Sequence, residues 1–478
     1  MENEKNNWGI CQECNGRGKK NMKVHKRNRL AYEIALDEFE KTGQKGTAPI
    51  KPIGHLYDCL ECSGSGLIST DKITEVDNNY PHVAIIGGGI GGIALAVACL
   101  HRGIPFSLFE RDSSFDSRSQ GYGLTLQQAS KAIKGLGLFS LKEGMFSTRH
   151  LVHKTDGEVI GEWGFRKWRN PNAQNSTKNT NIHIARQSLR LSFLEQLDNH
   201  NSIHWNHQLV DFKEDEKNGV NLNFLVNGET KHTKADLVVG ADGIRSTVRK
   251  LIINEEVSPL RYLGCIVILG ICSLKDLNGL ESHLLDSATV FQTANGKERM
   301  YMMPYSKDTI MWQLSFLMPE EDAKNLSKKG AKALKEEACK RTQWHSPVPQ
   351  ILTATLESHI SGYPVYDRET LKPEHLAKHT KTTLIGDAAH PMSPFKGQGA
   401  NQAILDALAL AREIHNGCKP ESNWKENGLQ KSVLDKFEAE MLKRSASKVK
   451  GSAETVALLH SEKILQKRDG PRGSSSQI

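Results

Sequence analysis

The chain of 478 residues lacks long hydrophobic runs. Its apolar segments are far shorter than the roughly 20 residues that a membrane-spanning helix needs. The first residues, MENEKNNWGICQEC, contain no apolar stretch of the kind found in secretory signals. There is also no general excess of one charge, because acids and bases are well mixed despite a net charge of +8. We therefore expect no membrane span and no secretory signal, and the charge balance does not by itself argue for a nucleic acid partner.

Cysteine usage does not fit a secreted disulfide framework. There are nine cysteines, an odd number, and only four of them form tight pairs in the sequence. We therefore expect a reducing, cytoplasmic location. The remaining five are scattered along the chain: Cys99, Cys265, Cys272, Cys339 and Cys418.

The two tight pairs belong to a repeated motif, C-x-x-C-x-G-x-G. It reads CQECNGRG from residue 11 and CLECSGSG from residue 59. This spacing suits thiolates that grip one tetrahedral ion, so that Cys11, Cys14, Cys59 and Cys62 would form a structural four-thiolate zinc site with no open position. A redox dithiol or unrelated surface thiols are the alternatives. The repeat resembles half of the cysteine-rich domain of the DnaJ chaperones.

Residues 1–75 are predicted to form this zinc-binding head. Val24–Lys41 has the pattern of a helix, with Leu30, Ala31, Ile34, Ala35 and Phe39 on one face. The basic stretch Arg17–Arg29 is either a solvated helix start or a patch for a partner or for nucleic acid. A protein partner for the head is therefore possible, and Ser69–Pro81 is expected to be a linker.

A βαβ unit follows the linker. Val83–Ile86 and Phe106–Phe109 have strand patterns and flank a glycine turn and an apolar helix. Gly87, Gly89 and Gly92 fit G-x-G-x-x-G, in which the glycines permit a tight turn, the approach of a pyrophosphate, and close helix–strand packing. A glycine-rich turn without a ligand is the alternative.

Three acids stand at the ends of predicted strands. Glu110, 23 positions after Gly87, can accept bonds from both ribose hydroxyls of an adenosine, which favours FAD or NAD over NADP. Asp242 follows the strand Leu237–Val239, and Asp387 follows the strand Thr382–Ile385. Open α/β sheets bind ligands at this edge.

The segment after Asp387 predicts what that ligand is. Gly397 and Gly399 lead into a helix, whose N-terminus can stabilise negative charge on an electron-rich ring. Asp387 can bond a polyol chain, and the bare backbone from Gly397 to Asn401 can lie against a planar ring. Pyrophosphate, polyol and planar ring together indicate FAD.

Residues 82–415 resemble the single-component FAD-dependent aromatic hydroxylases, the para-hydroxybenzoate hydroxylase-like class, and are similar to the tetracycline-inactivating flavin monooxygenases. The resemblance rests on GGGIGG, GADGIRSTVR and GDAAHPMSPFKGQGANQAILDA, in the family's order. It implies an α/β fold: a Rossmann-like FAD-binding domain with an inserted antiparallel β-sheet substrate domain. The cofactor-binding residues that it implies are Gly87, Gly89, Gly92, Glu110, Arg111, Arg118, Thr125, Arg186, Asp242, Asp387, Pro394, Gly397, Gly399, Ala400 and Asn401.

The resemblance also implies the reaction. NAD(P)H would reduce the flavin, and one oxygen atom of O2 would enter an aromatic or polycyclic small molecule, with no catalytic metal and no catalytic side chain assigned. Residues 255–320 read as antiparallel strands of the substrate layer. The side chains expected to face the substrate are Tyr301, Met303, Trp312 and Gln313.

The monooxygenase domain is expected to span residues 80–425, followed by C-terminal helices over 426–466 and a disordered tail over 467–478. Two other functions remain open. One is an FAD-dependent reductase or dehydrogenase without oxygen insertion. The other is a non-enzymatic flavoprotein tethered to a partner through its zinc head.

Overall fold

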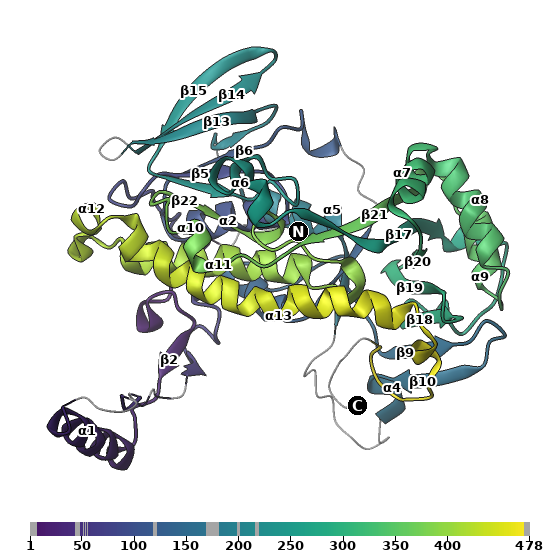
Figure 1. Ribbon diagram of the computed structural model, residues 1–478, viewed down its shortest axis with the longest axis horizontal. Coiled ribbons are helices and arrows are strands. Elements are labelled where there is room, and N and C mark those ends of the chain that lie inside the picture. The colour runs from purple at the N-terminus through teal and green to yellow at the C-terminus, as the bar shows by residue number, and fades with distance from the viewer. Residues whose placement is uncertain are drawn as a thin grey trace.

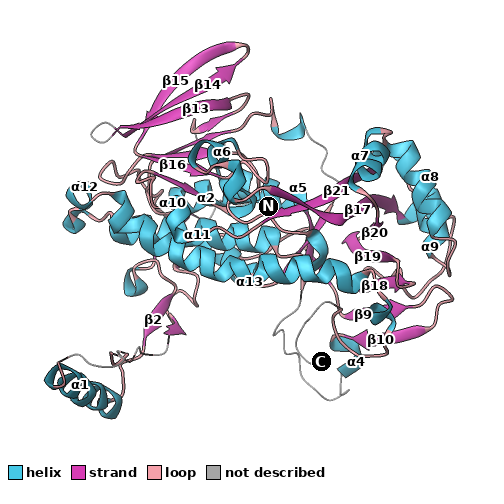
Figure 2. Ribbon diagram, in the orientation of Figure 1, coloured by secondary structure: helices cyan, strands magenta, loops and turns pink. Residues whose placement is uncertain are grey.

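The computed structural model describes residues 7–43, 48–50, 52, 54, 56–117, 122–168, 181–197, 201–215 and 219–472. Two large sheets lie at opposite ends of the body, joined by long helices (Figures 1 and 2). A small head with its own strands and one helix projects from one side. None of the described helices has the length and apolar character that crossing a membrane requires.

The first large sheet is parallel and has five strands. Its order is β12 (Ile203–His204), β6 (Phe106–Phe109), β5 (Val83–Ile86), β16 (Leu237–Gly240) and β22 (Thr382–Leu384). The apolar runs at β5, β6, β16 and β22 are therefore strands, as predicted, and parallel pairing buries both of their faces.

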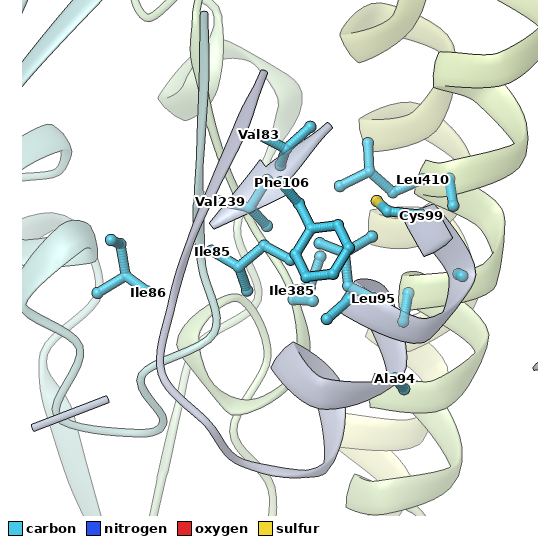
Figure 3. Close-up of a cluster of buried hydrophobic side chains, with 14 of the residues drawn as sticks. Val83, Ile85, Ile86, Ala94, Leu95, Cys99, Phe106, Val239, Ile385 and Leu410 are labelled. Carbon is cyan, nitrogen blue, oxygen red and sulfur yellow. The ribbon is translucent and has the colours of Figure 1, made fainter. Parts of the chain in front are cut away.

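Helices α2 (Ile90–Leu100) and α11 (Gly399–Gly417) pack against each other beside this sheet. Figure 3 shows the contact, with Ile85 and Phe106 of the sheet facing Leu95 and Cys99 of α2 and Leu410 of α11. Burial of these side chains supplies the hydrophobic stabilisation that fixes the glycine turn before α2 and the start of α11 in one place.

The second large sheet has seven strands and is assembled from three distant segments. Its order is β10 (Val159–Trp163), β9 (Arg149–His153), β18 (Thr289–Ala294), β19 (Glu298–Ser306), β20 (Thr309–Leu317), β17 (Leu260–Ser273) and β21 (Ile360–Arg368). The predicted antiparallel layer is present in β17 to β20, and only the β9–β18 pair is parallel. The sequence pattern did not reveal that β9, β10 and β21 complete the sheet.

One face of the seven-stranded sheet is covered by α7 (Glu320–Lys328), α8 (Ala331–Arg341) and α9 (Val348–Ala354) (Figure 1). Residues alternate between the two faces along each strand. Met300 and Met302 of β19 therefore point into the helix-covered core, whereas Arg299, Tyr301 and Met303 point to the other face.

Smaller elements surround these two sheets. They are two three-stranded sheets, β7 (Gly123–Leu126), β11 (Ile182–Ala185), β8 (Met145–Phe146) and β13 (Gln208–Asp215), β14 (Gly219–Val226), β15 (Glu229–Ala235), with the helices α3 (Ala129–Ala132), α4 (Phe165–Trp168), α5 (Arg186–Leu194), α6 (Thr247–Ile252), α10 (Pro373–Leu376) and α12 (Trp424–Asn427).

The C-terminal region is dominated by α13 (Asp435–Leu459), which runs along the length of the body (Figure 1). The ordered chain continues past the start of the expected tail at residue 467. Arg468 donates its backbone N–H to Ile160 O at 3.1 Å, and Asp469 accepts a bond from the backbone N–H of Glu162 at 3.0 Å. These bonds hold Arg468 and Asp469 against β10, at the start of the segment for which disorder is expected; residues 473–478 lie outside the described chain.

The head contains β1 (Asn7–Ile10) paired with β4 (Leu67–Thr70), and β2 (Lys19–Asn21) paired with β3 (Leu56–Asp58). Its helix α1 (Lys26–Lys41) matches the predicted segment, yet none of its residues is buried. Leu30 and Ile34 are 54% and 53% exposed, so the apolar face predicted to pack has no cover within the described chain.

Candidate flavin site and cysteine cluster

A cavity of about 950 Å³ lies between the two large sheets. Its walls come from the glycine turn before α2, the loops after β16 and β22, the start of α11, and the free face of the seven-stranded sheet. The volume falls in the range of sites for cofactors and small ligands. The three glycine and Gly-Asp motifs thus meet at one cavity, as the sequence predicted.

The glycine turn shows a separate constraint at each glycine. Gly87 has φ +109°, and a Cβ there would lie 2.6 Å from Ala241 O. At Gly92 a Cβ would lie 1.9 Å from Gly87 O, so that only glycine permits this helix–strand approach. Gly89 instead lines the cavity, and its Cβ position lies 4.0 Å from Ala241 O and from Arg186 Nη2, so no close contact requires glycine there. Its bare backbone at the α2 N-terminus is therefore accessible to an anionic group.

Glu110 lies behind this turn and fixes it. Its carboxylate accepts bonds from the backbone N–H groups of Gly88 at 2.6 Å and of Asp112 at 3.0 Å. The neighbouring Arg111 is exposed and does not line the cavity. Arg190, which the sequence analysis missed, is buried and donates from Nε to Gly88 O at 2.7 Å.

Arg186 begins α5 and places its guanidinium on the cavity wall. One Nη atom lies 4.0 Å from the Cβ position of Gly89, and the guanidinium carbon lies 5.5 Å from the centroid of the Tyr122 ring. A cation is therefore held beside the α2 N-terminus. Arg118, predicted to act in the same region, lies outside the described residues.

Asp387 follows β22 in the short helix η8 (Gly386–Ala388) and exposes its carboxylate to the cavity. Burial within the protein raises the pKa of this carboxyl, and the nearby His390 and Arg186 counteract that rise. No residue in the described chain forms a hydrogen bond with its side chain, so both oxygens remain available to a ligand.

A buried network positions this loop. The fully buried Asp406 of α11 accepts bonds from Gly386 N at 2.8 Å, from His390 Nε2 at 2.7 Å and from Arg444 Nη2 of α13 at 2.7 Å. Burial alone would raise the pKa of Asp406, but the charges and hydrogen bonds of His390 and Arg444 outweigh it, and the net pKa is lowered. The sequence could have indicated a buried role for Asp406, because this acid stands between apolar residues in the α11 segment AILDALALA.

The segment from Pro394 to Ala400, which contains the expected cofactor residues Pro394, Gly397, Gly399 and Ala400, lines the cavity. Asn401 differs. Its amide accepts from Gln127 N and Ala129 N and donates to Thr125 O and Gly397 O, all within 3.1 Å. Every hydrogen-bonding position of this buried amide is filled. Asn401 therefore fastens β7 to α11, and the expectation of a direct cofactor contact is not supported.

Asp242 also has a positioning role. Its carboxylate accepts bonds from the Ser246 hydroxyl, from Thr247 N at 2.6 Å and from Val248 N at 3.2 Å. Burial raises its pKa, and these bonds counteract the rise. The side chain holds the start of α6 and does not line the cavity, unlike its neighbours Ala241 and Gly243.

On the substrate-layer side, Tyr301, Met303 and Gln313 line the cavity, as predicted. Trp312 does not, so the expectation for this residue is wrong. Its ring is fully buried on the helix-covered face, where Nε1 donates to Thr355 Oγ1 at 2.9 Å. Thr125 also lines the cavity and shares a 3.0 Å hydrogen bond with His183 Nδ1.

The four predicted cysteines of the head come together. Their sulfur atoms all lie within 4.8 Å of one another, and the four residues are buried. The Sγ atoms of Cys11 and Cys59 are 4.0 Å apart, and those of Cys14 and Cys62 are 3.7 Å apart. Both distances are too long for a disulfide bond. Gly18 N and Gly66 N each donate to a sulfur at 3.2 Å. The turn that contains Cys11 and Cys14 and the turn that contains Cys59 and Cys62 therefore direct their sulfur atoms towards a common centre.

Residues 80–422 match the FAD binding domain family, and the protein belongs to this family. Its named relatives place it among the FAD-dependent monooxygenases. Aurachin C monooxygenase/isomerase of Stigmatella aurantiaca is 28% identical over 333 residues, which cover 69% of this chain and 79% of the relative. The 3-amino-4-hydroxybenzoate 2-monooxygenase PtmB3 of Streptomyces platensis is 26% identical over 347 residues, covering 71% and 81%.

The fold agrees with solved structures. HpxO of Klebsiella pneumoniae, in complex with FAD and uric acid, superposes with a TM-score of 0.65 and 18% sequence identity, covering 80% of this chain and 91% of HpxO. The family match begins at residue 80 and does not include the cysteine cluster.

We predict that Asp406→Asn destabilises the protein by roughly 3 kcal/mol, because it leaves Arg444 without its buried counter-charge. Urea unfolding followed by circular dichroism measures this change. The matched control is Glu440→Gln, which removes the other, 55% exposed partner of Arg444 and should cost less than about 1 kcal/mol. Equal losses for the two variants would contradict the central role of Asp406.

Proposed function

We propose that this protein is an NAD(P)H-dependent FAD monooxygenase that inserts one oxygen atom from O2 into an aromatic or polycyclic small molecule. The observation that carries the proposal is one cavity with four features. They are an anion-binding helix N-terminus at Gly89, the carboxylate of Asp387, the start of α11 at Gly399, and the sheet face with Met303. The names of the relatives support the reaction class, and one of them acts on an aromatic compound, 3-amino-4-hydroxybenzoate.

The residues present fit FAD. Gly89 and Arg186 would hold the pyrophosphate, because an accessible helix N-terminus and a guanidinium both favour a dianion there. Asp387 has two carboxylate oxygens that form no hydrogen bond with any described residue, and it would accept bonds from the ribityl hydroxyls. Gly397, Gly399 and Ala400 leave little side chain at the wall where the planar ring would lie.

Bound FAD would supply the redox chemistry, taking a hydride from NAD(P)H and activating dioxygen. The chain's own residues do the positioning. The α11 N-terminus directs its partial positive charge towards the ring site and favours negative charge there. Met303 and Met311 form an apolar part of the facing wall, which limits the access of water to the space left for the substrate.

Labelled dioxygen tests the reaction. With 18O2, NADPH or NADH, and a panel of phenols and fused-ring aromatics, we expect nicotinamide oxidation and a product heavier by one labelled oxygen atom, detected by mass spectrometry. Nicotinamide oxidation without label in any product would instead support a reductase, because all electrons would then leave without oxygen insertion.

We predict that Asp387→Ala weakens FAD binding by about tenfold or more, because hydrogen bonds to a charged group contribute roughly 1.5–3 kcal/mol. Fluorescence titration of the purified apoprotein with FAD measures the dissociation constant. The control is Asp308→Ala, an exposed acid in the turn between β19 and β20, which should bind FAD like the unaltered chain. Unchanged affinity in Asp387→Ala would contradict this role.

We also propose that Cys11, Cys14, Cys59 and Cys62 hold a structural zinc ion. A tetrahedral site with zinc–sulfur bonds of about 2.3 Å places its sulfurs about 3.8 Å apart. The 3.7 and 4.0 Å separations are close to that value. All four donors are thiols, which supports a closed structural site over a catalytic one.

Two arginines, Arg102, which is buried, and Arg412, which is half-buried, support the charge that such a site would carry. Zinc with four thiolates has a net charge of −2. Arg102 is 2% exposed and donates from Nη1 to Ala98 O, and Arg412 donates to Ser65 O at 3.0 Å within the second cysteine turn. No carboxylate in the described chain forms an ion pair with either, and both interact electrostatically with Cys14. An anionic cluster would compensate them.

We predict one zinc ion per chain in the purified protein and its loss in Cys59→Ser, measured by plasma mass spectrometry after dialysis. Removal of one thiolate opens the tetrahedral site and weakens its grip. Cys339→Ser serves as the control, since Cys339 lies on α8 outside the cluster. The same zinc content in Cys59→Ser and the unaltered chain would refute the four-thiolate site.

A further inference from the structure

Helix α1 of the head carries two apolar side chains that no part of the described chain covers. Leu30 and Ile34 are 54% and 53% exposed. They stand one turn apart and form a stripe along one side of the helix. A rotation of about 100° per residue places the half-buried side chains of α1 on the opposite side: Tyr32, Ala35, Leu36 and Phe39. The stripe therefore does not belong to the packing of the head itself.

The stripe extends in both directions with the spacing of a coiled-coil seam. Residues along this line alternate between intervals of three and four positions: Arg27, Leu30, Ile34, Asp37 and Lys41. Lys26 adds a second exposed cation at the start of the line, and Glu38 adds a second exposed acid near its end. An apolar centre thus lies between a basic end and an acidic end.

The charges are spaced symmetrically about the apolar pair. Arg27 stands three positions before Leu30, and Asp37 stands three positions after Ile34. Lys26 and Glu38 each stand four positions from the pair. A half-turn about the point midway between Leu30 and Ile34 therefore brings the cations onto the acids. Lys41 has no counterpart in this symmetry, because position 23 precedes the helix.

This symmetry selects a second copy of the same chain as the partner. In an antiparallel pair of α1 helices, Leu30 packs against Ile34 of the partner subunit, and Arg27 lies beside Asp37 of the partner subunit. A parallel pair would bring Arg27 beside Arg27 of the partner subunit, which is repulsive. A uniformly anionic partner, such as a membrane surface or a nucleic acid, would meet the acids of the same line and fits less well.

The helix is accessible to a second copy. It extends away from the body of the molecule (Figure 1). Its exposed ion pairs, Arg29 with Glu33 at 3.7 Å and Lys41 with Asp37 at 2.5 Å, lie within the helix and support it. The described residues that line the cavity begin at Gly89, so a contact through α1 leaves the cavity open.

We propose that two copies of the chain associate with two-fold symmetry through antiparallel pairing of their α1 helices. A contact between two such helices is smaller than the roughly 1,200–2,000 Å² that stable complexes bury. We therefore expect a dimer that dissociates on dilution. This inference is independent of the reaction that takes place in the cavity.

Sedimentation equilibrium of the purified full-length protein over a concentration series tests the proposal. The average mass should rise with concentration from the 53.2 kDa of one chain towards twice that value. Lys26→Glu/Arg27→Glu makes both ends of the line acidic, and Asp37→Lys/Glu38→Lys makes both ends basic. Each variant alone should dimerise about tenfold or more weakly, because each attraction becomes a repulsion. An equimolar mixture of the two variants should dimerise again, because opposite charges then meet at both ends.

Two controls separate pairing from net charge and from folding. Lys231→Glu/Lys234→Glu, at exposed positions of β15, changes the net charge as much as the acidic variant does and should dimerise like the unaltered chain. Leu30→Ala/Ile34→Ala should keep its helix content by circular dichroism, because alanine favours helix, and should dimerise about tenfold or more weakly.

Three results would each overturn the proposal. The first is an unaltered protein that stays monomeric throughout the series. The second is a pair of charge variants that dimerise as tightly as the unaltered chain. The third is a mixture of these variants that dimerises no better than either variant alone.

Discussion

The buried carboxylate of Asp406 on α11 joins this helix to the loop after β22 and to α13. It accepts bonds from Gly386 N and His390 Nε2 of that loop and from Arg444 Nη2 of α13. Asp387 lies one residue after Gly386, whose N–H is one of these donors. The direction in which Asp387 points into the cavity is therefore set by a charge network in the core, because a buried carboxylate needs every one of its partners.

Helix α11 connects the cavity with the cysteine turns of the head. Its start lines the cavity at Gly399, and Arg412, about 20 Å further along the axis, contacts the second cysteine turn at Ser65. Tyr80 bonds to His415 of the same helix at 2.8 Å, and Trp8 of the head stacks on Phe139 with ring centroids 4.3 Å apart. The cysteine turns are thus docked on the flavin domain, whereas α1 extends away from it (Figure 1).

Local sequence patterns predicted the elements well and the partners of side chains less well. Val83–Ile86 and Phe106–Phe109 are strands with the predicted bounds, because each is a short apolar run beside a glycine turn. Asn401 and Asp242 match the family motifs, yet their side chains form hydrogen bonds with backbone groups of the protein. A sequence motif does not predict these partners. The strands β9, β10 and β21 join the substrate sheet through long-range pairing that has no local signal.

The error at Trp312 has a different origin. Trp312 and Gln313 are adjacent on one strand, and adjacent residues of a strand point to opposite faces. Both could not have lined the cavity, so the alternation rule alone excluded one of them. Pairing decides which, because Tyr301 lies opposite Gln313 and Met302 lies opposite Trp312. Gly270, which pairs with Trp312, leaves room for the ring, since a Cβ there would lie 2.6 Å from it.

Two buried arginines, Arg249 and Arg299, differ in the hydrogen-bond partners that the fold gives them. Arg249 is as deeply buried as Arg299, but it donates to Ala388 O and Ala389 O and so holds the loop after β22. Arg299 has only a neutral amide as its partner and lines a cavity. Sequence alone gives both the same letter. The difference lies in which acceptors the folded chain brings within reach of each guanidinium.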